Sequence, residues 1–193
     1  EEMKAREDVH ETEISYNSTI SACAKGGRWE EAVELFEELK AREDVHEDEI
    51  SYSAVLEAVR HQQQIAEPIL LEALERGMLA KPRERTDAEW LFDLHKHSEG
   101  SAVTATRLWL EREVAPWHFG DGAQDPAMVG LITGYGKTRK SWGRSDVKAA
   151  VTQLLVEEMG VPVAQNAENK GRVYIDRGAW RQWDGKLPSD STE

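Results

Sequence analysis

Two stretches near the start of the sequence repeat each other. Residues 1–24 align with residues 37–60 at a constant offset of 36 positions, and 15 of the 24 aligned pairs are identical. A period of this length is typical of helical hairpins that stack on one another, because a single hairpin cannot bury its apolar face alone. The first part of the chain is therefore predicted to be a helical array, and we expect further repeats to precede residue 1.

Each repeat is predicted to hold two helices. Thr12 and Asp48 are equivalent, and their side-chain oxygens can accept the first backbone N–H groups of a helix. The first helix should end at Gly26-Gly27. The second should cover about residues 29–42, with a broad apolar face formed by Trp29, Ala32, Val33, Leu35, Phe36 and Leu39. In the next repeat we expect helices over residues 50–60 and from about residue 65 to 77, with Pro68 tolerated near the start.

Composition excludes several classes of protein. No apolar run approaches the roughly 20 residues of a membrane helix, and the single cysteine, Cys23, excludes an internal disulfide framework. The net charge of −13 argues against a generic nucleic-acid binder. However, residues 1–80 carry 8 basic and 20 acidic residues, whereas residues 81–193 carry 16 and 17. The acidity therefore belongs to the repeats, where much of it lies on solvated faces, and it does not exclude nucleic acid.

The pattern changes after the repeats. Residues 1–78 are predicted to be the repeat region and 79–88 a linker, with a domain over 89–185 and a loose tail over 186–193. The domain reads as β-α-β-α-β-β, an α/β two-layer sandwich. Its first strand, over residues 90–97, should place Asp93, His95 and His97 on one face. A second strand follows at 129–133, Ser145 should cap the second helix, and two further strands are expected at 161–164 and 172–175.

Polar and basic side chains follow the strands of this domain. Asp93 and His95 lie near the end of the first strand, and Gly134 and Gly136 follow the second, so they should meet at one edge of the sheet, where ligands commonly bind. A basic cluster comes next: Lys137, Arg139, Lys140, Arg144 and Lys148. Such a site suits a phosphate backbone, and His95 could act as an acid or base with Asp93 holding a metal or orienting water. Equally, an Asp-x-His pair can serve as a local cap, and a basic run can be a solvated loop.

The first half resembles the pentatricopeptide repeat family. The matching residues are ISYNSTISACAKGGRWEEAVELFEELK, which begin at Ile14, with specific cover over about 13–60 and weaker cover to about 78. The resemblance implies an array that binds single-stranded RNA at one base per repeat, selected by the fifth residue of a repeat together with its last. These residues are Asn17 and Asp48, a pair that in the family favours uridine. Ser53 is the fifth residue of the next repeat.

The second half resembles the small MutS-related (Smr) domain over about residues 89–177. The matching motifs are FDLH ending at His95, LITGYGK ending at Lys137, and NKGRV beginning at Asn169. The resemblance implies that the domain binds nucleic acid or cleaves it as an endonuclease, with Asp93, His95, Thr133, Gly134 and Gly136 involved. Two positions differ from the family pattern. Lys96 follows His95 in place of glycine, and Thr138-Arg139 replaces a His-Ser pair, so both cleavage and binding without cleavage remain open.

These features together predict an RNA-binding protein of organellar RNA metabolism. The repeats would read single-stranded RNA, and the Smr-like domain would bind or cleave the strand nearby, with Mg²⁺ or Mn²⁺ as a possible cofactor and DNA as a second possible substrate. The resemblance implies that the protein is located in a chloroplast or mitochondrion, and we expect its targeting segment to lie outside this sequence. Two alternatives are an RNA-stabilising or translation factor without catalysis, and a helical-repeat scaffold that binds proteins. No membrane association is expected.

Overall fold

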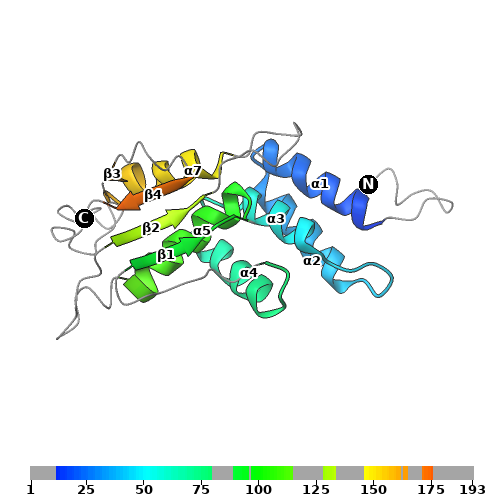
Figure 1. Cartoon of the computed structure of the whole chain (residues 1–193). Coiled ribbons are helices and arrows are strands. Elements are labelled where there is room, and N and C mark those ends of the chain that lie inside the picture. The colour runs from blue at the N-terminus through cyan, green and yellow to red at the C-terminus, as the bar shows by residue number, and fades with distance from the viewer. Residues whose placement is uncertain are drawn as a thin grey trace. The chain divides into compact units, whose positions relative to one another are not determined.

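The computed structural model describes residues 12–79, 89–95, 97–114, 128–133, 146–161, 163–164 and 171–175. The chain divides into two compact units, Glu1–Ala80 and Lys81–Glu193. Figure 1 shows helices alone in the first and a sheet with helices in the second. Each unit is described by itself below. Within the described residues, no helix is both long enough and apolar enough to cross a membrane.

Four helices make up the described part of the first unit, as two hairpins. They are α1 (Glu13–Lys25), α2 (Trp29–Ala41), α3 (Glu49–Ala58) and α4 (Gln63–Glu75). Thr12 and Asp48 are the N-caps of α1 and α3, as predicted, and each forms a reciprocal capping box with the serine three residues later. The turn after α1 needs Gly27, whose φ of 69° lies in the left-handed region. The predicted helical hairpins are therefore confirmed.

The second hairpin departs from the predicted bounds. The first helix was expected to reach Arg60, but α3 ends at Ala58, and α4 begins earlier than expected, at Gln63. Pro68 lies at the sixth position of α4, in its second turn, where it cannot donate a backbone hydrogen bond. The exposed side of the helix accommodates it, because the carbonyl that loses its partner can be hydrated there. The connection between the helices of this hairpin therefore keeps about its expected length but lies two residues earlier in the chain.

The apolar face predicted for the second helix of the first hairpin is buried along its centre. Ala32, Phe36 and Leu39 have no exposed surface, and Phe36 meets the ring of Tyr52 on α3 edge to face, with centroids 5.0 Å apart. Tyr52, Val55 and Leu56 of α3 are likewise fully buried. Helix α3 therefore packs against both α1 and α2, which joins the two hairpins through one core.

The second unit contains a four-stranded sheet in the order β1-β2-β4-β3. Its elements follow the predicted order β-α-β-α-β-β: β1 (Glu89–Asp93), α5 (Glu99–Trp109), β2 (Met128–Ile132), α7 (Val147–Gln153), β3 (Val163–Ala164) and β4 (Arg172–Ile175). Each helix continues into a π-helical turn, η1 (Leu110–Val114) and η2 (Leu154–Glu158). Strands β1 and β2 are parallel, and β4 is antiparallel to β2 and β3. Figure 1 shows β1, β2 and β4 side by side.

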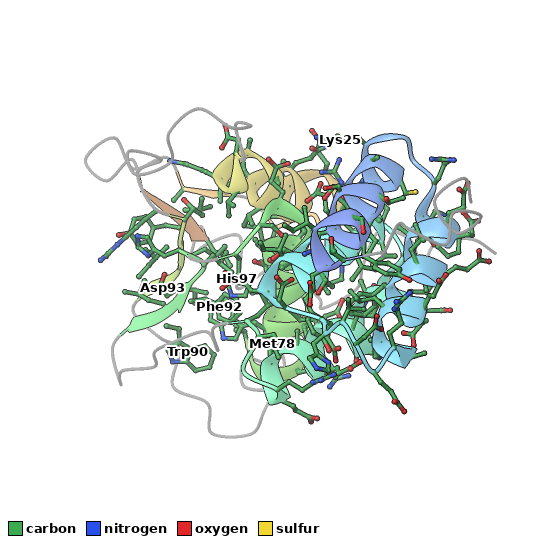
Figure 2. The ribbon with its side chains drawn as sticks, turned by 90° about the vertical axis from the view of Figure 1, so that its right-hand side faces the viewer. Lys25, Met78, Trp90, Phe92, Asp93 and His97 are labelled. Atoms are coloured by element: carbon green, nitrogen blue, oxygen red, sulfur yellow. The ribbon has the colours of Figure 1, made fainter. Side chains whose placement is uncertain are left out.

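The two faces of the sheet differ in burial. Phe92 stacks on Trp109 of α5 with centroids 4.7 Å apart, so this face meets the helix, and its other members are also buried: Trp90, Val129, Leu131, Val173 and Ile175. On the opposite face, Tyr174 is buried beside Gly130, whereas Asp93, Ile132 and Arg172 are only half-buried. Figure 2 labels Trp90, Phe92 and Asp93 on β1. The alternation places the core on one side and leaves Asp93 on the other.

Two local expectations for this unit were wrong. The first strand was predicted to continue to His97, but β1 ends at Asp93, and the backbone N–H of His97 donates to the carbonyl of Leu94 in a turn. His97 is therefore not in a row with Asp93 and His95, and its side chain is buried, with 1% exposed. Ser145 was expected to cap the second helix, but α7 is capped by Asp146, whose Oδ1 accepts from the backbone N–H of Ala149 at 2.9 Å.

Candidate nucleic-acid interface

The two residues predicted to read a base are in contact. Asn17 lies on α1 and Asp48 immediately precedes α3, and the Asn17 Nδ2 amide donates to Asp48 Oδ1 at 3.2 Å. The same Oδ1 accepts the backbone N–H of Ser51 at 2.8 Å, so the capping bond holds the carboxylate in place. The structure thus joins residues 31 positions apart in the sequence into one polar pair.

The pair has both used and unused hydrogen-bonding groups. Asp48 is half-buried, and its second oxygen, Oδ2, makes no hydrogen bond to any described residue. Asn17 is 8% exposed, and its buried Oδ1 has no hydrogen-bond partner among the described residues. An amide with one N–H already engaged has a second N–H to donate. The pair therefore offers one acceptor, on Asp48, and one donor, on Asn17, in a fixed relation.

The position equivalent to Asn17 in the next repeat is Ser53. It lies 36 residues later, on α3, and is half-buried. Its hydroxyl could also face a base, but the residue that would complete its pair falls in the stretch from 80 to 88, outside the described residues. For this repeat, only half of the predicted reading pair is described.

Sequence reasoning missed two exposed isoleucines beside these positions. Ile14 on α1 is 77% exposed and Ile50 on α3 is 61% exposed, and they are equivalent in the two repeats. Each lies three residues before a predicted reading position, Asn17 or Ser53, and residues three apart are neighbours on a helix surface. The identity of Ile14 and Ile50 was visible in the repeat alignment, but only the structure shows that both side chains face solvent.

Asp93 and His95 form a second candidate site, at the end of β1. Asp93 Oδ1 lies 2.6 Å from His95 Nδ1 and accepts the backbone N–H of His95 at 3.0 Å. Both side chains are accessible, at 40% and 55% exposed. The carboxylate favours the tautomer that carries the proton on Nδ1, which leaves Nε2 as the nitrogen to exchange a proton with a substrate. The contact comes from a turn, whereas strand alternation had been expected to align the two side chains.

The predicted residues after the second strand are only partly described. Thr133 donates to the Gly171 carbonyl through its backbone N–H at 2.9 Å and through Oγ1 at 3.3 Å, which anchors the end of β2 to the start of β4. Because Asp93 pairs in register with Ile132, Asp93 and Thr133 lie at the same edge of the sheet. The remaining predicted phosphate-binding residues lie outside the described residues: Gly134, Gly136, Lys137, Arg139, Lys140 and Arg144.

The described residues do not form a metal cluster. No group of three or more His, Cys, Asp or Glu side chains within the described ranges could hold a metal ion. One oxygen of Asp93 is already bonded to His95. We therefore derive no chemical step through a metal at this edge of the sheet.

Comparison with known proteins identifies the repeats. Residues 14–43 match the family model of the PPR repeat. A pentatricopeptide repeat-containing protein of Arabidopsis thaliana is 33% identical over 92 residues, which cover 46% of this chain and 10% of that protein. A second one from the same plant is 33% identical over 76 residues, covering 38% and 8%. One of Oryza sativa subsp. japonica, named chloroplastic, is 27% identical over 122 residues, covering 63% and 17%.

These matches support the pentatricopeptide repeat family for the first unit. The chain spans less than a fifth of the length of each of these curated relatives. The four-stranded sheet of the second unit is present, and its resemblance to the Smr domain stays a prediction.

Proposed function

We propose that this chain belongs to an RNA-binding protein whose repeats read single-stranded RNA. The observation that carries the proposal is the Asn17–Asp48 pair, in which a carboxylate oxygen and an amide N–H are held side by side next to an exposed isoleucine. Sequence-specific RNA recognition uses hydrogen bonds to the edges of unstacked bases and contacts with their flat faces. The match of residues 14–43 to the PPR repeat supports the same function.

The geometry of the pair suits uracil. The Watson–Crick edge of uracil has one N–H donor between two carbonyl acceptors. Asp48 Oδ2 can accept that N–H, and the second Nδ2 hydrogen of Asn17 can donate to a neighbouring carbonyl. Ile14 can cover a face of the base. A cytosine would present an acceptor in place of the N–H, and two acceptors facing each other would be repelled.

We propose further that the second unit is an Smr-like domain that engages the RNA backbone. The Asp93–His95 pair is exposed at the edge of the sheet, and the basic cluster follows shortly after in the sequence. In RNA cleavage, His95 Nε2 would accept the proton of a hydroxyl whose oxygen bonds to phosphorus, while the bond from phosphorus to the leaving oxygen breaks and that oxygen takes a proton from water. The Asp93 carboxylate would stabilise the imidazolium that forms. The Thr138-Arg139 pair, where the Smr family has His-Ser, favours a second candidate function: backbone binding without cleavage.

An organellar location is also proposed. The relatives found are plant proteins, and the name of one of them describes it as chloroplastic. An RNA-binding protein of this kind would act on transcripts made within the organelle. Localisation of the full-length protein fused to a fluorescent reporter in plant cells tests this, and a signal confined to the cytosol would contradict it.

RNA reading is tested by binding of labelled eight-nucleotide RNAs, measured by fluorescence anisotropy at low salt. Oligo(U) should bind more tightly than oligo(A) or oligo(C). Asp48→Asn should reduce the preference for oligo(U) about tenfold, because an amide in place of the carboxylate weakens a charge-assisted hydrogen bond. Glu34→Gln is the matched control, since it makes the same carboxylate-to-amide change at an exposed position of α2. Absence of any RNA affinity at low salt would reject this function and favour the protein-binding scaffold.

Cleavage is tested separately, with an end-labelled RNA containing a uridine run and with Mg²⁺ or Mn²⁺ present. If the domain is a nuclease, Asp93→Asn and His95→Ala should abolish cutting, while His46→Ala, at an exposed histidine of the first unit, should leave it unchanged. Binding without any cutting by the unaltered protein would support the alternative in which the domain only binds.

A further inference from the structure

Each hairpin of the first unit is closed by the same pair of side chains. In the first, Tyr16 Oη on α1 donates to Glu38 Oε1 on α2 at 2.9 Å. In the second, Tyr52 Oη on α3 donates to Glu72 Oε1 on α4 at 2.9 Å. The tyrosines are 36 residues apart and the glutamates 34. The same contact is thus built twice, with two fewer residues between the tyrosine and the glutamate in the second repeat.

An arginine accompanies each pair one helical turn later. Arg76 Nη1 donates to Glu72 Oε1 and to Tyr52 Oη, both at 3.2 Å. Arg42, which is 34 residues earlier, lies over the ring of Tyr16 at 6.0 Å from its centroid. Because a tyrosine, a glutamate and an arginine recur in both hairpins, the arrangement is a feature of the repeat.

Two residues outside the second hairpin, Lys40 and Glu47, bond to its Glu72 and Arg76 side chains and so connect it to the first hairpin. Lys40 Nζ, on α2 of the first hairpin, donates to Glu72 Oε2 at 2.8 Å. Glu47, which follows the first hairpin, pairs with Arg76. We name these five residues the Glu72 cluster: Lys40, Glu47, Tyr52, Glu72 and Arg76. One oxygen of Glu72 bonds within its own hairpin and the other bonds to the preceding one.

The cluster is partly shielded from water, which strengthens its ion pairs. The side chains of Lys40, Glu72 and Glu47 are 23%, 32% and 7% exposed. Burial opposes the charge of Glu72, but hydrogen bonds from Lys40 and Tyr52 outweigh it, and the pKa of Glu72 is lowered. Burial likewise opposes the charge of Lys40, yet the Glu72 carboxylate raises its pKa. Both groups therefore stay charged at neutral pH, and both favour the paired state.

The cluster and the base-reading pair connect the same two hairpins through different helices. Asn17 and Asp48 join them at α1 and the start of α3, whereas Lys40 and Glu72 join them at α2 and α4. Two attachments through separate helices fix the angle between hairpins as well as their contact. That angle determines how far apart equivalent positions of the repeats lie, including Ile14 and Ile50.

We propose that Lys40 and Glu47, through the Glu72 cluster, are positioning residues that set the spacing between successive base-reading positions. Neither residue belongs to the proposed base-reading pair, Asn17 and Asp48. The two positioning residues act by holding α4 against the preceding hairpin, so that Asn17 and Ile14 face one base and Ser53 and Ile50 face the next base of the strand. The spacing matters only if the repeats read RNA, so the functional consequence rests on the proposed function, whereas the positioning can be measured without RNA.

The first experiment measures that spacing in the whole chain. Spin labels are attached to Ile14→Cys and Ile50→Cys in a Cys23→Ala background, and their distance distribution is measured by dipolar electron paramagnetic resonance. The test variant combines Lys40→Met with Glu47→Gln, which leaves the net charge unchanged. The distribution should shift or broaden by about 1–2 Å, the size of helix movements at packed interfaces. The control combines Lys25→Met with Glu30→Gln, two exposed positions, and should match the unaltered spacing (Lys25 is labelled in Figure 2). An unchanged distribution in the test variant would overturn the inference.

The second experiment asks whether the spacing affects reading. Affinities are compared for oligo(U) and for an RNA of equal length in which uridines alternate with abasic sites. The ratio of the affinity for oligo(U) to the affinity for the alternating RNA should fall about threefold to tenfold in the test variant. A change of this size lies within the range by which mutations alter coupling between sites. A purely structural role would lower both affinities by one factor and keep the ratio, and that result would reject the positioning role. If the unaltered chain binds neither RNA, the proposed function fails, while the distance measurement still decides whether the cluster sets the spacing.

Discussion

Asp48 makes two contacts within the first unit, a cap on α3 and a hydrogen bond to Asn17 of α1, and a comparison of variants separates their contributions to stability. Its Oδ1 caps α3 through the Ser51 N–H at 2.8 Å and also accepts the Asn17 amide at 3.2 Å. Asp48→Ala removes both bonds. Thr12→Ala removes only a cap, because Thr12 holds the equivalent position at α1, where its Oγ1 accepts from Ser15 at 3.4 Å. The difference between these variants isolates the Asn17–Asp48 bond.

The expected magnitudes follow from these contacts. Losing an N-cap costs about 1 kcal/mol, with a range of roughly 0.5–2, and Thr12→Ala should lie at the low end because its bond is long. Asp48→Ala should cost that amount plus about 1–3 kcal/mol for a buried amide donor left without a partner. The total is about 2–4 kcal/mol. Asp48→Ser, which keeps a capping oxygen but is too short to reach Asn17, should fall between the two.

Hydrogen exchange of the backbone amides of α1 and α3 measures these costs locally, so that the second unit does not obscure them. Each 1.4 kcal/mol of lost stability speeds exchange from the opened state about tenfold. Asp48→Ala should therefore accelerate exchange in α3 well beyond the effect of Thr12→Ala in α1. If the two variants differ by less than about 0.5 kcal/mol, the Asn17–Asp48 bond contributes nothing to stability and the reasoning is refuted.

Two further predictions concern packing and pH. Gly130→Ala should lower the free energy of unfolding by about 1–3 kcal/mol. The reason is that an added Cβ would lie 2.9 Å from Cδ1 of Tyr174 and 3.2 Å from Cδ2 of Leu91. Thermal unfolding measures the effect, and an unchanged Tm would contradict it. Burial raises the pKa of Glu72, but the hydrogen bonds from Lys40 and Tyr52, together with the positive charge of Lys40, outweigh it, so the pKa is lowered in the folded state. Its stabilisation is therefore present above the unfolded pKa and lost as pH falls through the folded pKa. Unfolding followed between pH 7 and pH 3 should show a smaller acid-induced loss in Glu72→Gln than in the unaltered chain, and equal losses would reject the assignment.

Much of the fold could be predicted because its signals are local. The caps at Thr12 and Asp48 depend on residues within three positions of each other. The order of strands and helices along the second unit followed from apolar runs separated by turn residues. The arrangement of the four strands within the sheet, β1-β2-β4-β3, was not predicted. The repeat supplied the strongest signal, since two copies of one hairpin must adopt similar structures.

The features that the sequence did not predict correctly share one cause, because they depend on contacts that a pattern of residues does not reveal. Asp93 and His95 were expected to align through strand alternation, but β1 ends at Asp93, and the carboxylate captures the backbone N–H of His95 in a turn. The exposure of Ile14 could not be inferred, because an isoleucine in a helix is more often a core residue. The local sequence is compatible with both the expected and the observed arrangement of these residues. Which arrangement forms depends on the residues that surround them in the folded chain.

The sequence by itself determined the helical hairpins, their caps and the order of helices and strands along the chain. These depend on local backbone preferences and on periodicity, which the chain carries wherever it is placed. Only the tertiary structure decided how the hairpins are joined. The tyrosine, glutamate and arginine of the Glu72 cluster recur at offsets of 36 residues for the tyrosine and 34 for the glutamate and arginine, so a single-offset alignment does not detect them. Lys40 meets Glu72, 32 residues away, because packing of α2, α3 and α4 brings two partly buried charges together, and an ion pair depends on distance and surroundings, which folding alone supplies.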